Sequence, residues 1–493
     1  MVGRKFVAKT NDGAVLINQK MVSGVIALTG RGFFVRVLSF FSLGFLGAFL
    51  TREEFGTFFL VSAVVNFLVY FSDIGLAAAL VQKKENVTDN DLKTTFTIQQ
   101  TLVVTLLILL FVFSSSIQDI YNLTDEAVGL MWALGFSFFT SSLKTIPSIL
   151  LERDLQFNRW VLPQLIEDIV YNLLVVLLAW RGMGIASFSY AVVARSLVGL
   201  VVVYFLRPWV PGLLISRDSL VKLLKFGIPY QINTFLAVLK DDGLTIVLGG
   251  VLGAGGVGVL GWAQKWAQIP LRLFMDTVTK VSFPVFSRLQ EDHKALAKST
   301  TKSIFFICFL VFPSIVGICT LAPVLIDIVP RYDKWRVALL PLFLVSINVF
   351  FAASTTQLTN LLNAIGKIKL TFKLMIMWTI LTWLLIPILA INFGVVGASL
   401  GFALVGASSL VALHIAHVNV PFDLKEAIFE PAVAAGIMAS VMWTLASLLP
   451  RDFAGVFINS LLGVSVYVAV LIGFKGKVFV YDVKKLFNQI IKR

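Results

Sequence analysis

The 493-residue chain is poor in charge, cysteine and histidine, and each shortage argues against a class of protein. Only 14% of its residues are charged, 58% are hydrophobic, and the mean hydropathy is +0.90, whereas a soluble domain has about 25% charged residues. Cys308 and Cys319 share one apolar run, which predicts small buried side chains rather than a disulfide or a metal pair. His293, His414 and His417 lie at or near loops without a Cys or carboxylate at ligand spacing, so no metal site is predicted.

The sequence also lacks the features of an enzyme or a nucleic-acid-binding protein. It contains no phosphate-binding loop, no catalytic constellation and no large extramembrane segment, so we expect no enzyme and no cofactor. The net charge of +14 comes from basic residues spread between apolar runs, which is the positive-inside pattern and not a nucleic-acid patch. The polar, basic start has no signal-peptide core close behind its charges, so the first apolar run is expected to stay as a span.

What the chain does contain is a series of apolar runs long enough to cross a membrane. A bilayer core needs about 20 helical residues, so the runs predict an all-α polytopic membrane protein with about fourteen transmembrane helices. Short glycine-marked turns at 181–182, 253–256 and 393–394 predict three antiparallel hairpins. The expected spans are 22–50, 55–81, 96–116, 127–150, 160–180, 183–206, 222–249, 255–282, 303–326, 337–362, 370–391, 393–416, 428–449 and 454–474.

Two echoes within the sequence indicate an internal repeat. Residues 181–201 align without gaps on residues 393–413, and EEFGTF at 53–58 echoes GGVGVL at 255–260. Both offsets correspond to six spans, so the copies keep one orientation and predict two pseudo-symmetric six-helix lobes. The alternative is that small residues recur in any membrane helix because they allow close packing.

The distribution of Lys and Arg predicts the orientation. Few basic residues lie in the loops after odd-numbered spans: Arg52, Arg181, Arg331, Lys334, Arg336 and Arg451. Cytoplasmic loops carry the excess of Lys and Arg, so both termini are predicted to be cytoplasmic. The expected parts are an N-terminal segment, an N-lobe, a cytoplasmic linker, a C-lobe, spans 13 and 14, and a basic cytoplasmic tail: residues 1–21, 22–207, 208–221, 222–417, 418–474 and 475–493.

The strongest functional signal is the charge of the eighth span. Four charged residues there fall within a stripe roughly 80° wide on one helical face: Lys265, Arg272, Asp276 and Lys280. Charge inside a bilayer survives mainly where it meets water, a ligand or a partner charge. Lys265 and Arg272 flank Pro270, which is expected to kink the helix, and they predict a cavity lining, with structural pairing as the alternative. Lys280 suits an anchor at the inner interface.

Charges in other spans extend this prediction. Lys144 and the pair Glu167-Asp168 lie in spans four and five, and the bias towards cations in spans one and eight favours an anionic substrate such as a diphosphate. The predicted substrate-binding cations are Arg31, Arg36, Arg195, Lys240, Lys265 and Arg272. The candidates for coupling to a proton or Na⁺ gradient are Asp73, Asp241, Asp242 and Asp276, with structural ion pairs as the alternative. Trp262 and Trp266 are candidates for stacking on sugar.

Several segments resemble the oligosaccharide flippases of the multidrug/oligosaccharidyl-lipid/polysaccharide exporter superfamily. The first is LTREEFGTFFLVSAVVNFLVYFSDIGLAAALVQKKE, residues 50–85. LLERDLQFNR at 150–159, DDGLTIVLGGVLGAGGVGVLGWAQKWAQIPLRLF at 241–274 and FPVFSRLQED at 283–292 are similar to the branch that exports exopolysaccharide units such as colanic or teichuronic acid repeats. One departure is Val259-Leu260, where many members have a Tyr after the glycine.

This resemblance implies a fold, a substrate and a site. The fold would be two six-helix lobes forming a V, with spans 13 and 14 added, in a bacterial inner membrane. The substrate would be an undecaprenyl diphosphate-linked oligosaccharide, moved from the inner to the outer leaflet by alternating access. Membrane lipids and the polysaccharide polymerase with its chain-length machinery are the further expected partners. By position, basic residues of spans one and eight would line the central cavity: Arg31, Arg36, Lys265 and Arg272.

Three rival functions fit the sequence less well. A cation-coupled multidrug antiporter of the same superfamily would need an acidic cavity, which deep cations oppose. A membrane polymerase or ligase would need a long outer loop rich in Arg or His, whereas the predicted outer loops are short. A scaffold without transport activity leaves the repeat and the buried charges unexplained. The identity of the glycan, the oligomeric state and the driving force, whether H⁺, Na⁺ or the membrane potential, stay open.

Overall fold

The computed structural model describes residues 30–83 and 85–476, apart from the side chains of Tyr230, Ile232, Asn233, Asp276 and Thr277. Every regular element in this described part is a helix, which confirms the all-α fold class. The chain divides into two compact units, residues 1–258 (unit 1) and 259–493 (unit 2). The predicted segment 1–21 and nearly all of the predicted tail 475–493 lie outside the described residues. The lobe boundary predicted at 208–221 stays a prediction.

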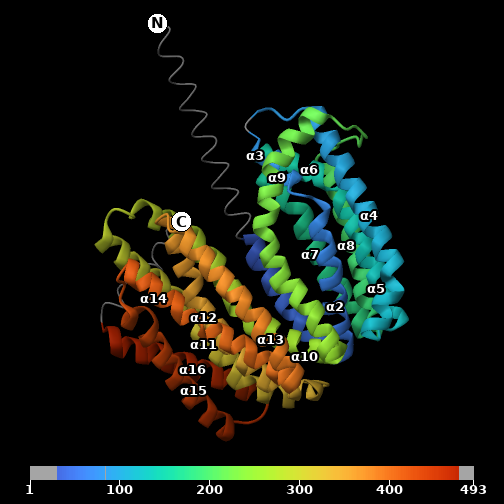
Figure 1. Cartoon of the computed structure of the whole chain (residues 1–493). Helices are drawn as coiled ribbons and strands as arrows, with labels where there is room; N and C mark the ends of the chain where they lie inside the picture. The colour runs from blue at the N-terminus through green and yellow to red at the C-terminus, as the bar shows by residue number, and fades with distance from the viewer. Residues whose placement is uncertain (1–29, 84, 477–493) are drawn as a thin grey trace. The chain divides into compact units, whose positions relative to one another are not determined.

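Unit 1 begins, in its described part, with the helix Gly30–Phe49. The elements that follow are α2 (Arg52–Val69), η1 (Tyr70–Ser72), α3 (Leu76–Gln82), α4 (Asp89–Tyr121), α5 (Asp125–Leu143), α6 (Thr145–Arg153), α7 (Phe157–Trp180), α8 (Ala186–Leu206), α9 (Arg217–Val238), the π-helical turn η2 (Leu239–Gly243) and the start of α10 (Leu244–Arg288). Helix α8 packs against α7 and α5, and α5 packs against α4, so that α4, α5 and α8 run side by side (Figure 1).

Unit 2 begins within α10. It continues with α11 (His293–Ile328), η3 (Asp333–Ala338), α12 (Leu339–Ala364), α13 (Ile368–Ala407), α14 (Ser409–Asn419), η4 (Lys425–Phe429), α15 (Glu430–Leu448) and α16 (Phe453–Lys475). Helix α12 packs against α11, α13 and α14, and the C-terminal pair α15 and α16 packs against α11 (Figure 1).

Within the described residues, 11 helices are long and apolar enough to cross a membrane, or up to 12 if the bent pair α5 and α6 is one span. The polytopic prediction is therefore confirmed, while the count of fourteen is not. Two of the long helices contain a glycine with non-helical dihedral angles at an expected turn, Gly253 in α10 and Gly394 in α13.

Around Gly394 the chain folds back on itself, as predicted. A Cβ placed on Gly401 would lie 2.9 Å from the Cα of Ile386, whereas 15 residues of straight helix would separate these positions by about 22 Å. The predicted hairpin at 181–182 is also present, because α7 and α8 are joined by five residues that include Gly182 and Gly184, both with positive φ, and pack together.

The predicted second span is broken in the structure. It divides into α2, η1 and α3, with positive φ at Ile74 (30°) and Gly75 (73°). The break lies against α9, since a Cβ on Gly75 would come within 2.3 Å of the carbonyl oxygen of Gly227. Tyr70 and Gln231 exchange hydrogen bonds across the same contact.

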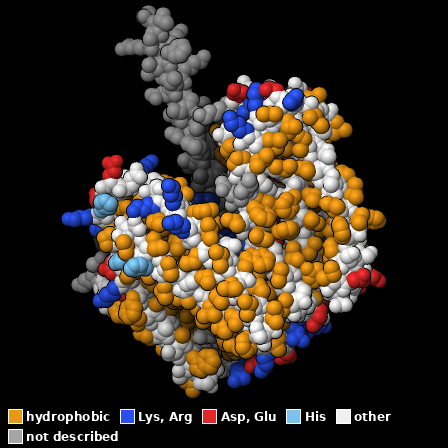
Figure 2. Space-filling view, in the orientation of Figure 1, with side chains coloured by type: hydrophobic (Ala, Val, Ile, Leu, Met, Phe, Trp, Pro, Cys, Tyr) orange, Lys and Arg blue, Asp and Glu red, His pale blue; other side chains and the backbone are white. Residues whose placement is uncertain are grey.

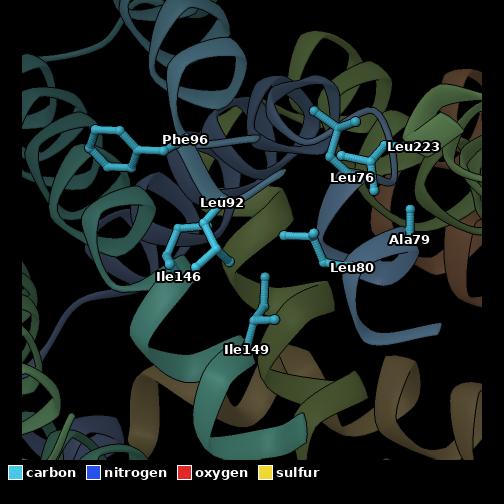
Figure 3. Packing of buried hydrophobic residues seen from close by; sticks show 8 residues of the cluster. All are labelled: Leu76, Ala79, Leu80, Leu92, Phe96, Ile146, Ile149 and Leu223. Carbon is cyan, nitrogen blue, oxygen red and sulfur yellow. The ribbon is translucent and has the colours of Figure 1, made fainter. Parts of the chain in front are cut away.

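A compact apolar cluster holds the short helix α3 in place. It joins α3 to α4, α6 and α9 through buried side chains (Figure 3): Leu76, Ala79, Leu80, Leu92, Phe96, Ile146, Ile149 and Leu223. Such burial stabilises by about 25 cal/mol per Å² of apolar surface removed from water. The α3 part of the broken span is therefore fixed by packing rather than by continuity with α2.

Two glycines bring α2 into backbone contact with the start of α10. A Cβ on Gly56 would meet the carbonyl oxygen of Ala254 at 1.6 Å, and a Cβ on Gly258 would meet that of Arg52 at 1.9 Å. Gly56 and Gly258 are 202 positions apart, as are Arg52 and Ala254, so the two contacts correspond under the echo between 53–58 and 255–260. The contact is therefore self-complementary.

Apolar side chains cover most of the described surface on the face shown in Figure 2, and charged side chains gather towards its margins. This distribution fits helices whose outer faces meet lipid. Polar caps mark several helix starts. Thr51 and Glu54 form a capping box at α2, and Thr88 and Asp91 form another at α4, so each helix begins where a side chain satisfies its first N–H groups.

Candidate functional site

The first group of charges within the spans of unit 1 centres on Arg31. Its Nη2 donates to Oδ2 of Asp168 on α7 at 3.0 Å, and the side chains are 24% and 20% exposed. This single contact uses one of the five guanidinium N–H donors. The buried Nε of Arg31 has no hydrogen-bond partner. Arg31 is thus neutralised by a carboxylate and still has donor capacity left.

The neighbouring carboxylate on α7, Glu167, holds two further cations. Its Oε1 accepts from Nζ of Lys144 at 2.6 Å, and its Oε2 lies 4.0 Å from Arg195 on α8. The Arg195 guanidinium also lies 5.2 Å from the ring centre of Tyr171, close enough for a cation–π contact. A Cβ on Gly199 would lie 1.7 Å from the Glu167 carboxylate, so the glycine makes the room that Glu167 occupies.

Lys144 lies at the 43° bend between α5 and α6. Its pair with Glu167 is the more buried one, with side chains 13% and 11% exposed. Among the predicted binding cations of unit 1, the structure therefore brings Arg31 and Arg195 to adjacent carboxylates of one helix. These carboxylates and Lys144 were visible in the sequence as charges in spans, but their pairing was not.

A second group lies on the π-helical turn η2. Lys240 and Asp241 form a loose pair at 3.6 Å, and the Asp241 side chain is 74% exposed. Asp242 accepts a hydrogen bond from the side chain of Asn66 on α2. The two carboxylates therefore point to different surroundings, as expected for consecutive residues. Single-turn π-helices often occur at functional sites.

Asp73 lies at the break between α2 and α3. The Oδ1 of Asp73 accepts from the backbone N–H of Ala77 at 3.0 Å, and its carbonyl accepts from that of Leu76. Asp73 therefore caps the start of α3 and closes the break in the span. Arg36 is half-buried on the first described helix.

In unit 2 the predicted charged face of α10 is present. Lys265, Arg272 and Lys280 all have exposed side chains. Nη2 of Arg272 donates to Oε1 of Gln268 at 2.8 Å. The dihedral angles at Pro270 stay helical. Asp276 follows on the same helix, but its side chain lies outside the described part.

Of the two tryptophans predicted to stack on sugar, Trp262 is buried in a cluster of aromatic side chains. It is 3% exposed, its ring stacks on Trp335 of η3 at 5.0 Å, and it also contacts Tyr332 and Trp266. Its buried Nε1 has no hydrogen-bond partner. Trp266 is half-buried beside it, so Trp266 is the one with surface left for a sugar.

A polar cluster that the sequence did not single out lies next to this face. The buried Gln357 of α12 accepts from Ser282 at 2.8 Å and from Ser303 at 3.3 Å, and its amide donates to Thr279 at 3.1 Å. Met275 and Asn360 complete the group. The sequence signal for this cluster is the polar stretch 354–360 within an apolar span. Within residues 30–83 and 85–476, no three or more His, Cys, Asp or Glu side chains group to hold a metal ion.

Comparison with known proteins adds to this geometry. The model of a family described as "Polysaccharide biosynthesis protein" matches residues 45–340. The lipopolysaccharide biosynthesis protein WzxC of Escherichia coli is 24% identical over 73% of this chain and 73% of its own length. The succinoglycan biosynthesis transport protein ExoT of Rhizobium meliloti is 22% identical over 76% of this chain and 75% of its own.

Solved structures show the same fold. The lipid II flippase MurJ, in an inward closed conformation, matches 93% of this chain and 100% of its own with a TM-score of 0.74 and 18% identity. An inward-facing multidrug resistance transporter of the MATE family matches 81% of this chain and 98% of its own with a TM-score of 0.61 and 15% identity. At these identities the likeness concerns the fold alone.

Proposed function

This chain belongs to the family of polysaccharide biosynthesis proteins, and from that membership we propose that it is a flippase for lipid-linked oligosaccharide repeat units. It takes a diphosphate-linked sugar headgroup at the inner leaflet of a bacterial inner membrane and releases it at the outer leaflet by alternating access. The relatives are named for making lipopolysaccharide and succinoglycan, and one is named a transport protein. The chain is a transporter and not an enzyme.

The observation that carries this proposal is the exposure of Lys265 and Arg272 on an apolar spanning helix. A charged group at that depth costs at least about 2.5 kcal/mol when it faces lipid, so it needs water or an anion. Cations suit a diphosphate and oppose the cationic drugs of a multidrug antiporter. Because the multidrug transporter shares the fold, the fold alone cannot decide between the two functions, whereas the sign of the charge favours the flippase.

The two units contribute different charge balances to the spans. Apart from Lys222 and Lys225 at the start of the seventh, the predicted spans of unit 1 hold as many carboxylates as cations: Asp73, Glu167, Asp168, Asp241 and Asp242 against Arg31, Arg36, Lys144, Arg195 and Lys240. The predicted eighth span, which lies within α10, has three cations and one carboxylate: Lys265, Arg272 and Lys280 with Asp276. Within the spans, the excess of positive charge is therefore concentrated on α10.

The test is a leaflet assay in proteoliposomes with a lipid-diphosphate oligosaccharide. Arg272→Ala and Arg31→Ala should each reduce the translocation rate at least tenfold, because each removes a forked donor to phosphate. Lys280→Ala is the matched control, since it removes one charge from the same helix at the expected interface and should leave the rate within about twofold. Wild-type rates in both arginine variants would show that these cations do not bind the substrate.

Ion coupling is assigned to η2. The exposed Asp241 and the adjacent Asp242 are the carboxylates best placed to exchange a proton or Na⁺ with solvent. In the same assay, an imposed pH or Na⁺ gradient should accelerate the wild-type protein, and Asp241→Asn should remove that acceleration. Equal acceleration of the Asp241→Asn protein would exclude this site.

A further inference from the structure

The ion pair between Arg31 and Asp168 leaves hydrogen-bond donors of the arginine unused. Arginine and a carboxylate commonly form two parallel hydrogen bonds, yet here only Nη2 contacts Asp168, at 3.0 Å, while the buried Nε has no partner. An oxyanion with more acceptors would satisfy this guanidinium better than Asp168 does. A diphosphate carries such oxygens.

The pair next to it on α7 has the opposite character. Glu167 contacts Lys144 at 2.6 Å in the most buried of these pairs, and Gly199 leaves the space in which its carboxylate lies. A lysine ammonium is a compact charge that is satisfied by one close carboxylate. Glu167 is thus committed to Lys144, which lies at the bend between α5 and α6, whereas Asp168 holds its arginine by one contact.

We propose that Asp168 is an internal counter-anion that neutralises Arg31 in the empty transporter and is displaced when the substrate diphosphate binds. An uncompensated arginine within the membrane is costly, so a carrier that returns empty needs a replacement for the substrate's charge. Because Asp168 competes with the substrate, it also limits the affinity and so permits release at the outer leaflet. Asp168 acts through Arg31 and is a positioning residue.

This inference rests on the proposed function, and a binding experiment separates the two. The probes are geranylgeranyl diphosphate and inorganic diphosphate, each titrated calorimetrically into the full-length protein in detergent. Asp168→Asn should bind geranylgeranyl diphosphate at least tenfold more tightly than wild type, because the competing carboxylate is gone. In the leaflet assay the same variant should turn over several-fold more slowly, because release is slowed. For inorganic diphosphate, the affinity of Asp168→Asn should exceed that of wild type by the same factor.

Matched variants exclude a general effect of lost charge or lost folding. Asp154→Asn breaks another arginine pair of unit 1, that with Arg207 at 3.1 Å, and should leave the affinity unchanged. Asp168→Glu keeps the carboxylate and should stay near wild type. In the Arg31→Ala background, Asp168→Asn should produce no gain, since the two residues act as one unit.

The outcomes are distinct. A wild-type protein that binds neither probe would overturn the proposed function itself. A wild-type protein that binds geranylgeranyl diphosphate, with an Asp168→Asn variant that binds it equally or more weakly, would overturn the role of Asp168 alone. A tenfold gain that persists in the Arg31→Ala background would also overturn it, because the gain would not depend on the arginine.

Discussion

At the scale of single residues, the clearest structural role belongs to Arg153 at the end of α6. Its guanidinium donates to four backbone carbonyl oxygens, those of Leu80, Val81, Lys83 and Glu85. Two of these carbonyls belong to the last turn of α3, where the helix leaves them unsatisfied. One side chain thus closes the C-terminus of α3 and fixes the loop that follows it.

We expect Arg153→Ala to lower the free energy of unfolding by about 2 to 3 kcal/mol, since it removes charge-assisted hydrogen bonds and strands several carbonyls. A thermal unfolding measurement in detergent should show the loss as a lower Tm. Arg159→Ala removes the same charge from an exposed position, where the guanidinium makes a long hydrogen bond of 3.4 Å to Oε1 of Gln156. It should change the stability by less than about 0.5 kcal/mol, and equal Tm values for both variants would contradict this role.

The sequence predicts which spans carry charged residues, but it does not predict which of these residues form ion pairs. Arg31, Arg195, Lys265 and Arg272 stand out because charge is rare in apolar runs. The pairing of Arg31 with Asp168 spans 137 positions of sequence, and no local pattern encodes such a distance. For the same reason the packing of Trp262 on Trp335 was not foreseen.

At the scale of secondary-structure elements, glycine marks the breaks at the three predicted turns but does not reveal a fourth break, at residues 73–75. The breaks at Gly253 and Gly394 were predicted because each lies between two apolar runs of full length. The break at residues 73–75 lies inside one apolar run, so hydropathy carried no signal for it. The stretch Ser72-Asp73-Ile74-Gly75 combines a capping carboxylate with a glycine, which is the local signature that could have found it.

Gly75→Ala tests whether this break depends on close packing. Gly75 has a φ of 73° and a Cβ there would strike the backbone of Gly227, while Gly182 has a φ of 80° and open space around it. Gly182→Ala should therefore lower the free energy of unfolding by about 1 to 2 kcal/mol, because alanine is strained in the left-handed conformation. Gly75→Ala should lower it by the same amount plus roughly 1 to 3 kcal/mol, because the added methyl group overpacks the contact. Thermal unfolding in detergent measures the loss of stability in each variant. Equal losses in the two variants would mean that α3 and α9 can move apart to accept the added methyl group.

At the scale of the whole molecule, composition and run length were enough to establish an all-helical membrane protein. The number of spans was less certain, because helices merge across glycine breaks and bend at others. The fold of MurJ matches 93% of the chain. This match agrees with the family resemblance of the segments 50–85, 150–159, 241–274 and 283–292. Orientation depends on loop charge alone and remains a prediction.

Cysteine labelling can test this orientation in a variant with Cys308 and Cys319 replaced by Ala. Glu126 and Lys294 are exposed residues in the first turns of α5 and α11, and the distribution of Lys and Arg assigns them to opposite sides of the membrane. In spheroplasts, Glu126→Cys should react with a membrane-impermeant maleimide, and Lys294→Cys only after permeabilisation. The reverse result would invert the topology and, with it, the proposed direction of transport.

The contact between Gly56 and Gly258 has a consequence for the origin of this chain. In a symmetric homodimer, residues near the two-fold axis meet their own copy, and here two positions related by the internal echo meet in that way. An ancestral six-helix protein that dimerised through this helix would have needed glycine at the equivalent position before its gene was duplicated. A side chain gained there would have collided with the partner's backbone twice, once from each subunit. If the echo reflects such a duplication, the two glycines are one requirement inherited from that dimer interface.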